Sequence, residues 1–579
     1  GGGSGYRKDV FYRMGQISHD RRKTVIAFSL VVFFSLGSLI ATGSEFTDAF
    51  DGDDMESYQA HNMITEAFAS NESEGESGLS GGRSFTIIFT HDEWNASNSQ
   101  FAQAVNLTLD GISDFSSIEY IQTPWNVDTN LSEWHYSDDE SHMRVEVVFS
   151  ADIDAKAAYR ELMDDIKCGS LSCWRTGDVA IDTTFDDRMV DDLIKAELLA
   201  APLTIILLII VFSSIVAALL PVAISIPTVI SGVGIIFWLS NQMDVNNYAM
   251  NIVSLIGIGV SIDYSLFIVN RFREELLNGH DKREALAITG ATAGKAVFFS
   301  GITVVIGLTG MLFFEGTGLP SMGIGGALAV ALAVFFSTTF LMAILSLLGE
   351  NVNRFKVPFG MKQDMGEDGL WSRLADIVMR KPLLTLIPIL ILLIGAGTPF
   401  LNVQLGLGGI DLLAPDEEVR VGSEIQEEEW SDFGQAEIFA VFDLQGEERY
   451  GNETIDILHN FSSSIADRED VSTVFSMYYP NVAMNATDLK EIYSLPISQQ
   501  PVPIQELVNA TSTEDTIVIR VVYLPEPGSP GAHNLVKELR LMEDEIPFQG
   551  KVGGWAAISV DIIEEVYDKT PIAVTYILL

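Results

Sequence analysis

The sequence predicts a polytopic α-helical membrane protein that carries two extracytoplasmic α+β domains. Mean hydropathy over the 579 residues is +0.25, and several apolar runs exceed the ~18 residues typical of a membrane-spanning helix. The net charge of -45 comes from two long blocks between those runs. Residues 44–200 hold 33 of the 79 Asp and Glu, and residues 402–571 hold another 32. Acidic surfaces stay soluble in concentrated salt, so this composition indicates a halophile, and less readily an acidic patch for cationic ligands.

The order of the segments follows from the apolar runs and the turns between them. Within the first acidic block, Ser84–Thr90 and His142–Ser150 have strand composition, and 99–115 and 154–166 have helical periodicity. We expect, in order, a linker and cytoplasmic N-terminus (1–23), a first span (24–43), a first extracytoplasmic domain (44–197), a bundle of spans two to six (198–349), a cytoplasmic linker (350–382), a seventh span (383–401), a second extracytoplasmic domain (402–570) and the start of an eighth span (571–579). Spans two and three are predicted at 201–219 and 221–239.

Two independent features predict the orientation in the cell membrane. All 17 Lys and Arg outside the acidic blocks lie in 1–23, 271–295 and 354–381, which the positive-inside rule places in the cytoplasm together with the N-terminus. Every Asn-x-Ser/Thr sequon lies in an acidic block, which favours an external position for both domains. These candidate N-glycosylation sites are Asn71, Asn95, Asn106, Asn130, Asn452, Asn460, Asn485 and Asn509. Cys168 and Cys173, in the first block, could form a small-loop disulfide outside the cell.

The chain also repeats itself with an offset of about 350–380 residues, too long for a solenoid. Strand 85–89 resembles 438–442, and Arg175–Ala180 resembles Lys551–Ala556, each followed by a helix and an apolar run. A copy of one span plus one soluble domain indicates a duplicated transporter half. We therefore expect an internal duplication whose second half is incomplete in this chain.

Asp263 is an ionisable residue near the middle of the apolar run 250–272. A carboxylate at that depth costs about 2.5–3.5 kcal/mol on insertion scales, so it is usually kept for a function. Helical spacing places Gly259, Asp263, Phe267 and Asn270 on one face. A carboxyl group in a low-dielectric bundle can load and release a proton near the working pH.

The motif around this residue resembles the RND superfamily in its MMPL-like branch. The resemblance rests on Gly257-x-Gly259 before Asp263-Tyr264, on Phe267 and on the basic exit at Arg271-x-Arg273. It implies that Asp263 carries the proton of a mid-membrane relay and that Tyr264 is its hydrogen-bonding neighbour. It also implies that Ser300 and Thr303 of the fifth span supply hydroxyl partners. Together with the acidic composition it predicts a source among the halophilic archaea.

The expected function is a secondary transporter, driven by an ion gradient, that exports a hydrophobic or lipid-like substrate. Protons are the expected ion, with sodium as the alternative. A lipid- or sterol-sensing receptor or an accessory subunit of protein secretion is the alternative function, since the same architecture serves those roles. A glycosylated surface protein with a simple anchor is disfavoured. An anchor needs only one span, and a carboxylate within the membrane would be a cost without a function.

The remaining expectations concern partners and cofactors. Membrane lipids and the hydrophobic substrate are the expected partners, and a homo-oligomer or a surface-protein partner is compatible with the sequence. Nucleic acid is disfavoured by the acidic exterior. The eight scattered histidines form no metal-binding motif, and Gly290–Lys295 lacks the spacing and the Ser/Thr of a P-loop. We expect no metal, no cofactor and no enzymatic activity.

Overall fold

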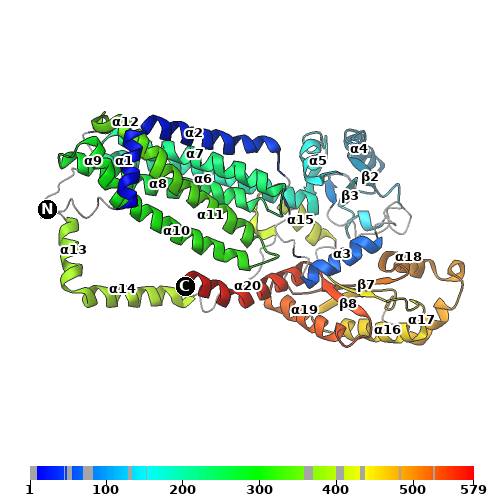
Figure 1. Ribbon diagram of the computed structural model, residues 1–579. Coiled ribbons are helices and arrows are strands. Elements are labelled where there is room, and N and C mark those ends of the chain that lie inside the picture. The colour runs from blue at the N-terminus through cyan, green and yellow to red at the C-terminus, as the bar shows by residue number, and fades with distance from the viewer. Residues whose placement is uncertain are drawn as a thin grey trace. The chain divides into compact units, whose positions relative to one another are not determined.

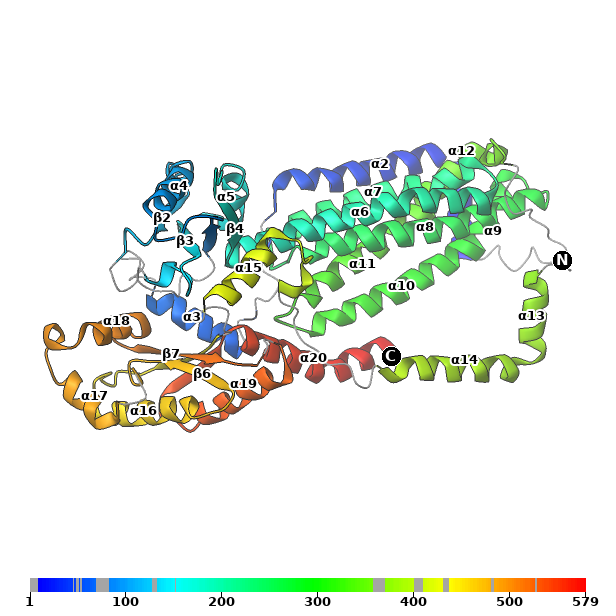
Figure 2. The same ribbon diagram turned by 180° about the vertical axis from the view of Figure 1, so that it is seen from behind.

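Two compact units make up the chain, and each is formed by segments that are distant in sequence. Unit 1 comprises Gly1–Gly52, Leu193–Leu405 and Glu565–Leu579, and unit 2 comprises Asp53–Asp192 and Gly406–Glu564. The computed structural model (Figures 1 and 2) describes residues 9–44, 46–47, 52, 55–68, 83–127, 133–150, 153–357, 370–399, 410–430, 437–480, 484–525 and 528–579. The statements below concern these residues.

Unit 1 is helical. Its helices are α1 (Val10–Asp20), α2 (Arg22–Gly37), α7 (Ile215–Ser240), α8 (Tyr248–Leu277), α9 (Lys282–Thr289), α10 (Lys295–Thr309), α11 (Leu319–Phe336), α12 (Met342–Leu348), α13 (Leu370–Arg380) and α14 (Pro382–Gly397), together with parts of α6 (Asp178–Phe212) and α20 (Trp555–Leu578). Six described helical stretches are long and apolar enough to cross a membrane. A seventh is added if the bent pair α13–α14 counts as one span. This confirms a multi-pass helical membrane protein.

The boundary between the second and third candidate spans differs from the sequence prediction. The expected break near Pro221 is wrong, because Pro221 lies inside α7. The helices are interrupted at Ser213–Ser214, where Ser213 has φ of 53° and the Ser214 hydroxyl donates to the carbonyl oxygens of Val352 (2.8 Å) and Arg354 (2.9 Å). A two-residue break inside a continuous apolar run leaves no composition signal, so the sequence could not place it.

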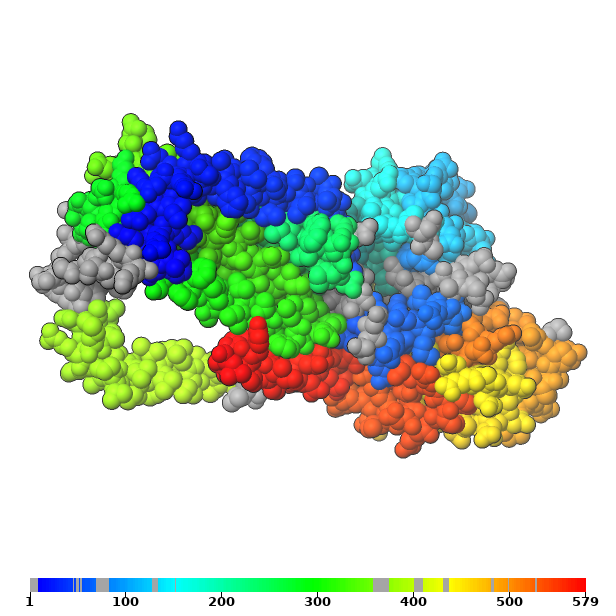
Figure 3. All heavy atoms as spheres, viewed as in Figure 1, coloured from blue at the N-terminus to red at the C-terminus, as the bar shows by residue number. Residues whose placement is uncertain are grey.

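Small residues allow the helices of unit 1 to pack closely. A Cβ atom on Gly325 of α11 would lie 2.5 Å from the carbonyl oxygen of Ala249 in α8. A Cβ atom on Gly234 of α7 would lie 2.0 Å from the carbonyl oxygen of Leu36 in α2. Close backbone approach at glycine is typical of helices that associate in lipid. Figure 3 shows α1 and α2, in blue, lying over one face of the green helices of this unit.

Unit 2 contains two four-stranded antiparallel sheets with the same strand order. The first is ordered β2-β3-β1-β4 and the second β6-β7-β5-β8. The strands are β1 (Ser84–Thr90), β2 (Ile118–Gln122), β3 (His142–Phe149), β4 (Ser172–Thr176), β5 (Glu437–Asp443), β6 (Val471–Phe475), β7 (Thr516–Tyr523) and β8 (Gln549–Gly553). A β-α-β-β-α-β unit with this order has the ferredoxin-like topology. Both sheets have a register shift at the same place, between Ile118 and Tyr120 in β2 and between Val471 and Thr473 in β6.

Helices cover these sheets. They are α3 (Glu56–Phe68), α4 (Ser99–Asp110), α5 (Ala155–Leu162), α15 (Glu418–Glu429), α16 (Asn452–Ala466), α17 (Ala486–Tyr493), α18 (Val502–Thr511) and α19 (Pro530–Glu543). The predicted strands at 84–90 and 142–150 are confirmed as β1 and β3, and the predicted helices at 99–115 and 154–166 as the shorter α4 and α5. The repeated strand 85–89 lies in β1 and its counterpart 438–442 in β5, which occupy equivalent places in their sheets.

Two helices are exchanged between the domains. Ala60, Ile64 and Phe68 of α3, which follows the first candidate span, pack against Val441 of β5 and Val518 of β7 in the second sheet. Helix α15 follows α14 in the chain, yet it packs on the first sheet. A Cβ atom on its Gly422 would lie 3.2 Å from Trp174 Cβ in β4. The first domain is therefore completed by α15, which precedes the second domain in sequence. The second domain is completed by α3, which precedes the first domain (Figure 2).

Candidate functional site

Helix α8 holds Asp263 midway along its length. It is the fourth candidate span, and its apolar composition makes it a good helix in lipid. Asp263 shares an exposed stripe with Leu255, Gly259 and Phe267, each four residues apart, and Phe267 is 61% exposed. The predicted face is therefore turned away from the other described helices. Gly259 has open space around it, and the close glycine contact falls on Gly257, whose Cβ would lie 3.2 Å from Val229.

Asp263 has no hydrogen bond or ion pair with any other described residue. The carboxylate thus stands on an apolar face without a described partner, although such groups in membranes are normally paired or lie in a water-filled cavity. The arrangement is chemically suited to binding a cation. A proton can bind directly to a carboxylate oxygen.

Tyr264, about 100° around the helix from Asp263, points into the helix bundle. It is 9% exposed and belongs to the apolar cluster of unit 1. A Cβ atom on Gly301 of α10 would lie 3.7 Å from the Tyr264 hydroxyl, an ordinary contact distance, so this hydroxyl lies beside α10. The Asp-Tyr pair therefore places its carboxylate and its phenol on different faces of one helix.

Ser300 and Thr303 flank Gly301 on α10, and both are exposed. The Thr303 hydroxyl donates to the carbonyl oxygen of Phe299 in its own helix (3.0 Å). Within the described residues neither hydroxyl is bonded to Asp263. Helices α8 and α10 both pack against α11, and they contribute these polar groups from separate helices.

No sequence pattern indicates the second polar contact of this helix, which lies next to Tyr264. The buried hydroxyls of Ser265 in α8 and Ser337 are 3.3 Å apart. Ser337 opens a π-helical turn, Ser337–Leu341, between α11 and α12, and such turns are frequent at functional sites. A serine pair has no spacing signal in a single sequence. Another π-helical turn, Gly290–Gly294, occupies the segment that partly resembles a P-loop.

Charged residues gather at the C-terminal end of α8. Glu275, whose side chain is 4% exposed, pairs with Arg271 (2.5 Å) and with His280 (2.9 Å). Arg273 donates from Nε to Asn353 Oδ1 (2.7 Å). These bonds fix the C-terminal end of α8. The Arg271 guanidinium compensates the charge of this buried carboxylate.

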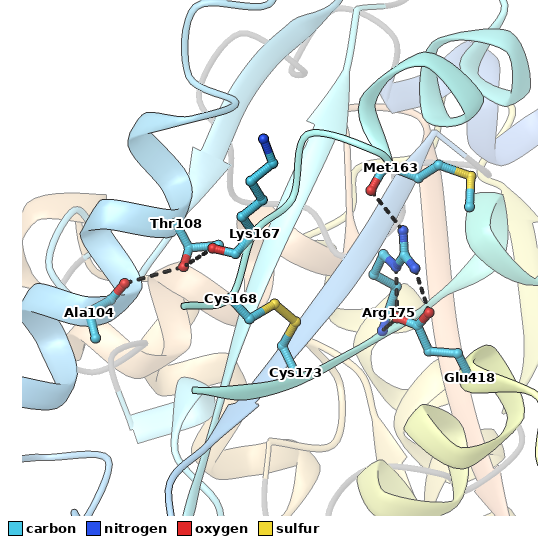
Figure 4. The surroundings of a disulfide bond; sticks show 8 residues. All are labelled: Ala104, Thr108, Met163, Lys167, Cys168, Cys173, Arg175 and Glu418. Atoms are coloured by element: carbon cyan, nitrogen blue, oxygen red, sulfur yellow. Dashed lines mark hydrogen bonds and ion pairs between the residues drawn. A yellow bond between two sulfur atoms is a disulfide. The ribbon is translucent and has the colours of Figure 1, made fainter. Parts of the chain in front are cut away.

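The predicted cysteine pair and sequons lie in unit 2. Cys168, just before β4, and Cys173, within β4, form a disulfide (Figure 4). Asn71 and Asn130 lie outside the described residues. The side chains of the other six sequon asparagines are all exposed, namely Asn95, Asn106, Asn452, Asn460, Asn485 and Asn509.

Helix α15 is held to the first domain by ion pairs near its N-terminus. Arg175 Nε donates to Glu418 Oε1 (2.7 Å), and its Nη1 donates to the Met163 carbonyl oxygen (3.0 Å; Figure 4). Arg188 pairs with Glu417 at 2.6 Å. Bidentate guanidinium–carboxylate pairs are geometrically specific, so they fix the docking position of the exchanged helix.

Comparison with known proteins identifies the family. A model described as "MMPL family" matches residues 49–385. The mycolic acid-containing lipids exporter MmpL11 of Mycolicibacterium smegmatis is 34% identical over 256 residues, which are 44% of this chain and 27% of the relative. The trehalose monomycolate exporter MmpL3 of the same organism is 29% identical over 411 residues, 66% of this chain and 38% of the relative. The heme uptake protein MmpL11 of Mycobacterium tuberculosis is 31% identical over 257 residues, 44% of this chain and 27% of the relative.

These matches span 27–38% of the relatives' own length. Among solved structures, the hedgehog release protein Disp from the water bear Hypsibius dujardini aligns with a TM-score of 0.58. The alignment covers 98% of this chain and 82% of that chain at 12% identity, which is a likeness of fold. Since the family model covers more than half of the chain and includes α8 with Asp263 and Tyr264, the chain belongs to the MMPL family of the RND superfamily.

Proposed function

We propose that the protein is a secondary transporter, driven by an ion gradient, that moves a hydrophobic or lipid-like substrate outward. One observation carries the proposal: an exposed carboxylate, Asp263, stands midway along an apolar helix without a described partner. Proton binding at Asp263 is the coupling step we propose. Tyr264, Ser300 and Thr303 have no bond to Asp263 within the described residues, so we propose that they contribute to the relay through intervening groups and not by direct contact.

The equivalence of the two sheets supports an internal duplication. Both domains have the same strand order and the same register shift, and each is preceded by a candidate span. A duplicated transporter places its ion site between the two repeats. The outward face of α8 is therefore the surface at which a second helical half would supply the partner of Asp263.

The substrate class rests on the relatives. Two of them are exporters of mycolic acid-containing lipids and of trehalose monomycolate by name, and a third is a heme uptake protein. All three substrates are amphiphilic molecules with large apolar parts. The simplest proposal that fits all three relatives is that this chain also transports a lipid-like substrate.

The test of transport compares cells with and without the protein. Cells that lack it are expected to retain in the membrane an envelope lipid that the parent delivers to the outside. To measure this distribution, cells are grown with a labelled lipid precursor, and the label is then counted in the surface fraction and in the membrane fraction. Unchanged lipid distribution with altered amounts of secreted proteins would contradict the proposal and favour the secretion role.

The proposed topology places the N-terminus and the end of α8 in the cytoplasm and unit 2 outside. Ser97→Cys, in exposed chain before α4, is expected to react with a membrane-impermeant maleimide in intact cells. Asn278→Cys, at the end of α8, is expected to react only after permeabilisation. The native cysteines are both in the disulfide, so each variant carries one free thiol. Labelling of Asn278→Cys in intact cells would overturn the orientation.

The halophilic source and the glycosylation of the exposed sequons stay predictions. They agree with the concentration of acidic residues in the two domains. Carboxylate-rich surfaces retain water and counter-ions in concentrated salt, so the same composition supports an external position in a saline medium.

A further inference from the structure

A histidine and two carboxylates from distant parts of the chain meet beside the first sheet. They are Asp139 in the turn before β3, His142 at the start of β3, and Glu429 at the end of α15. One ligand atom from each residue lies within 4.8 Å of the other two. All three residues belong to unit 2.

The spacing of these atoms suits a shared ion better than a direct bond. His142 Nδ1 and Glu429 Oε2 are 3.7 Å apart, which is longer than a hydrogen bond. Two ligand atoms bound about 2.1 Å from one tetrahedral ion are roughly 3.4 Å apart. The Ser141 hydroxyl is 2.6 Å from the same Nδ1 atom of His142, so a small cation between the imidazole and the carboxylates would displace this hydroxyl.

Hydrogen bonds hold the ligand-bearing segments in place. Asp139 Oδ1 accepts from the Ser137 hydroxyl (2.9 Å) and from the backbone N–H of Ser141 (2.8 Å). The backbone N–H of Asp138 donates to the carbonyl oxygen of Glu429 (3.0 Å), which ties α15 to the turn. Supporting bonds of this kind orient metal ligands.

We propose that Asp139, His142 and Glu429 bind a divalent transition-metal ion, with Zn²⁺ or Mn²⁺ as the expected class. Imidazole favours these ions over Mg²⁺ and Ca²⁺, which prefer oxygen ligands alone. Sequence spacing could not reveal the site, because Glu429 follows His142 by 287 residues and no local motif joins them. The proposal differs from the expectation that the chain holds no metal.

The ion would bind the exchanged helix α15 to the first domain at a second position. Its N-terminal end is held by the pairs Arg175–Glu418 and Arg188–Glu417, and the metal would fix its C-terminal end at Glu429. The site would thus couple metal binding to the stability of the first domain, since an ion that binds only the folded state stabilises it.

The full chain, purified in detergent and freed of metal with a chelator, is titrated calorimetrically with ZnCl₂, MnCl₂ and CaCl₂ in turn. One site per chain is expected for Zn²⁺ or Mn²⁺, with affinity at least about tenfold lower in Glu429→Gln and His142→Ala. Glu428→Gln is the matched control, since this exposed neighbour lies outside the cluster, and it should bind as the parent does.

A second measurement uses the unaltered chain. Bound Zn²⁺ should protect His142, and not the exposed His280, from modification by diethyl pyrocarbonate, as read by mass spectrometry. Absence of calorimetric binding, equal affinity for Ca²⁺, or binding that is unchanged in both cluster variants would overturn the proposal. Unchanged modification of His142 in the presence of Zn²⁺ would also overturn it, even if a variant fails to fold.

Discussion

Asp263→Asn is expected to reduce transport by the full chain to the background level of membranes without the protein. The amide keeps the size of the side chain but cannot take up or release a proton near neutral pH. The fold should be unaffected, because Asp263 lies on an exposed face and has no bond to another described residue. Export of the labelled lipid, measured at equal amounts of protein in the membrane, gives the result.

Two variants sharpen this experiment. Asp244→Asn removes an acidic group from the short turn before α8 and should leave export unchanged. Asp263→Glu keeps a titrating carboxyl group and should retain partial activity. Full activity of Asp263→Asn would exclude the ion-carrying role. Equal losses in Asp244→Asn and Asp263→Asn would point to a general effect of charge.

Glu543→Gln is expected to stabilise unit 2 at high pH. Glu543, in the last turn of α19, is 8% exposed and packs against Gly550 of β8. Burial, together with the nearby carboxylate of Glu56, raises the pKa of Glu543 to about 7. The folded state holds the Glu543 proton more tightly than the unfolded state. The contribution of Glu543 to the free energy of unfolding is therefore greatest below pH ~4.5 and falls as the pH rises to ~7.

Glutamine reproduces the neutral acid without the charge. The gain in the free energy of unfolding should be on the order of 3 kcal/mol above pH 7 and close to zero at pH 4.5. Urea unfolding of the full chain in detergent, followed by tryptophan fluorescence, reports chiefly on unit 2, which holds six of the eight tryptophans. Glu545→Gln, an exposed neighbour, should show no such pH dependence. A gain that does not vary between pH 4.5 and 8 would contradict the assignment.

The sequence predicted those parts of the fold that depend on local pattern. Strands β1 and β3 were predictable because they are rich in β-branched and aromatic residues, and the candidate spans because lipid demands ~20 apolar residues. The break at Ser213–Ser214 was missed because it depends on two carbonyl groups more than a hundred residues away. The exchange of α3 and α15 was also missed, since amphipathic periodicity shows that a helix packs but not on which sheet.

For the candidate site too, the sequence could predict some features and not others. Asp263 could be found from sequence, because one carboxylate in an apolar run is rare. Its outward position could not, since helical spacing defines a face without saying what covers that face. The Ser265–Ser337 contact and the cluster at His142 join residues far apart in the chain, and their chemistry exists only after the helices and sheets have packed.

The exchange of helices also sets an order of events during synthesis. Ile64 of α3 is made 377 residues before Val441, the strand residue against which it finally packs. At 5–20 residues per second, the apolar stripe of α3 waits roughly 20 to 75 seconds for its partner strand. During that interval the first domain also lacks α15. Neither domain can therefore reach its final form by itself on the ribosome, and the two must mature together.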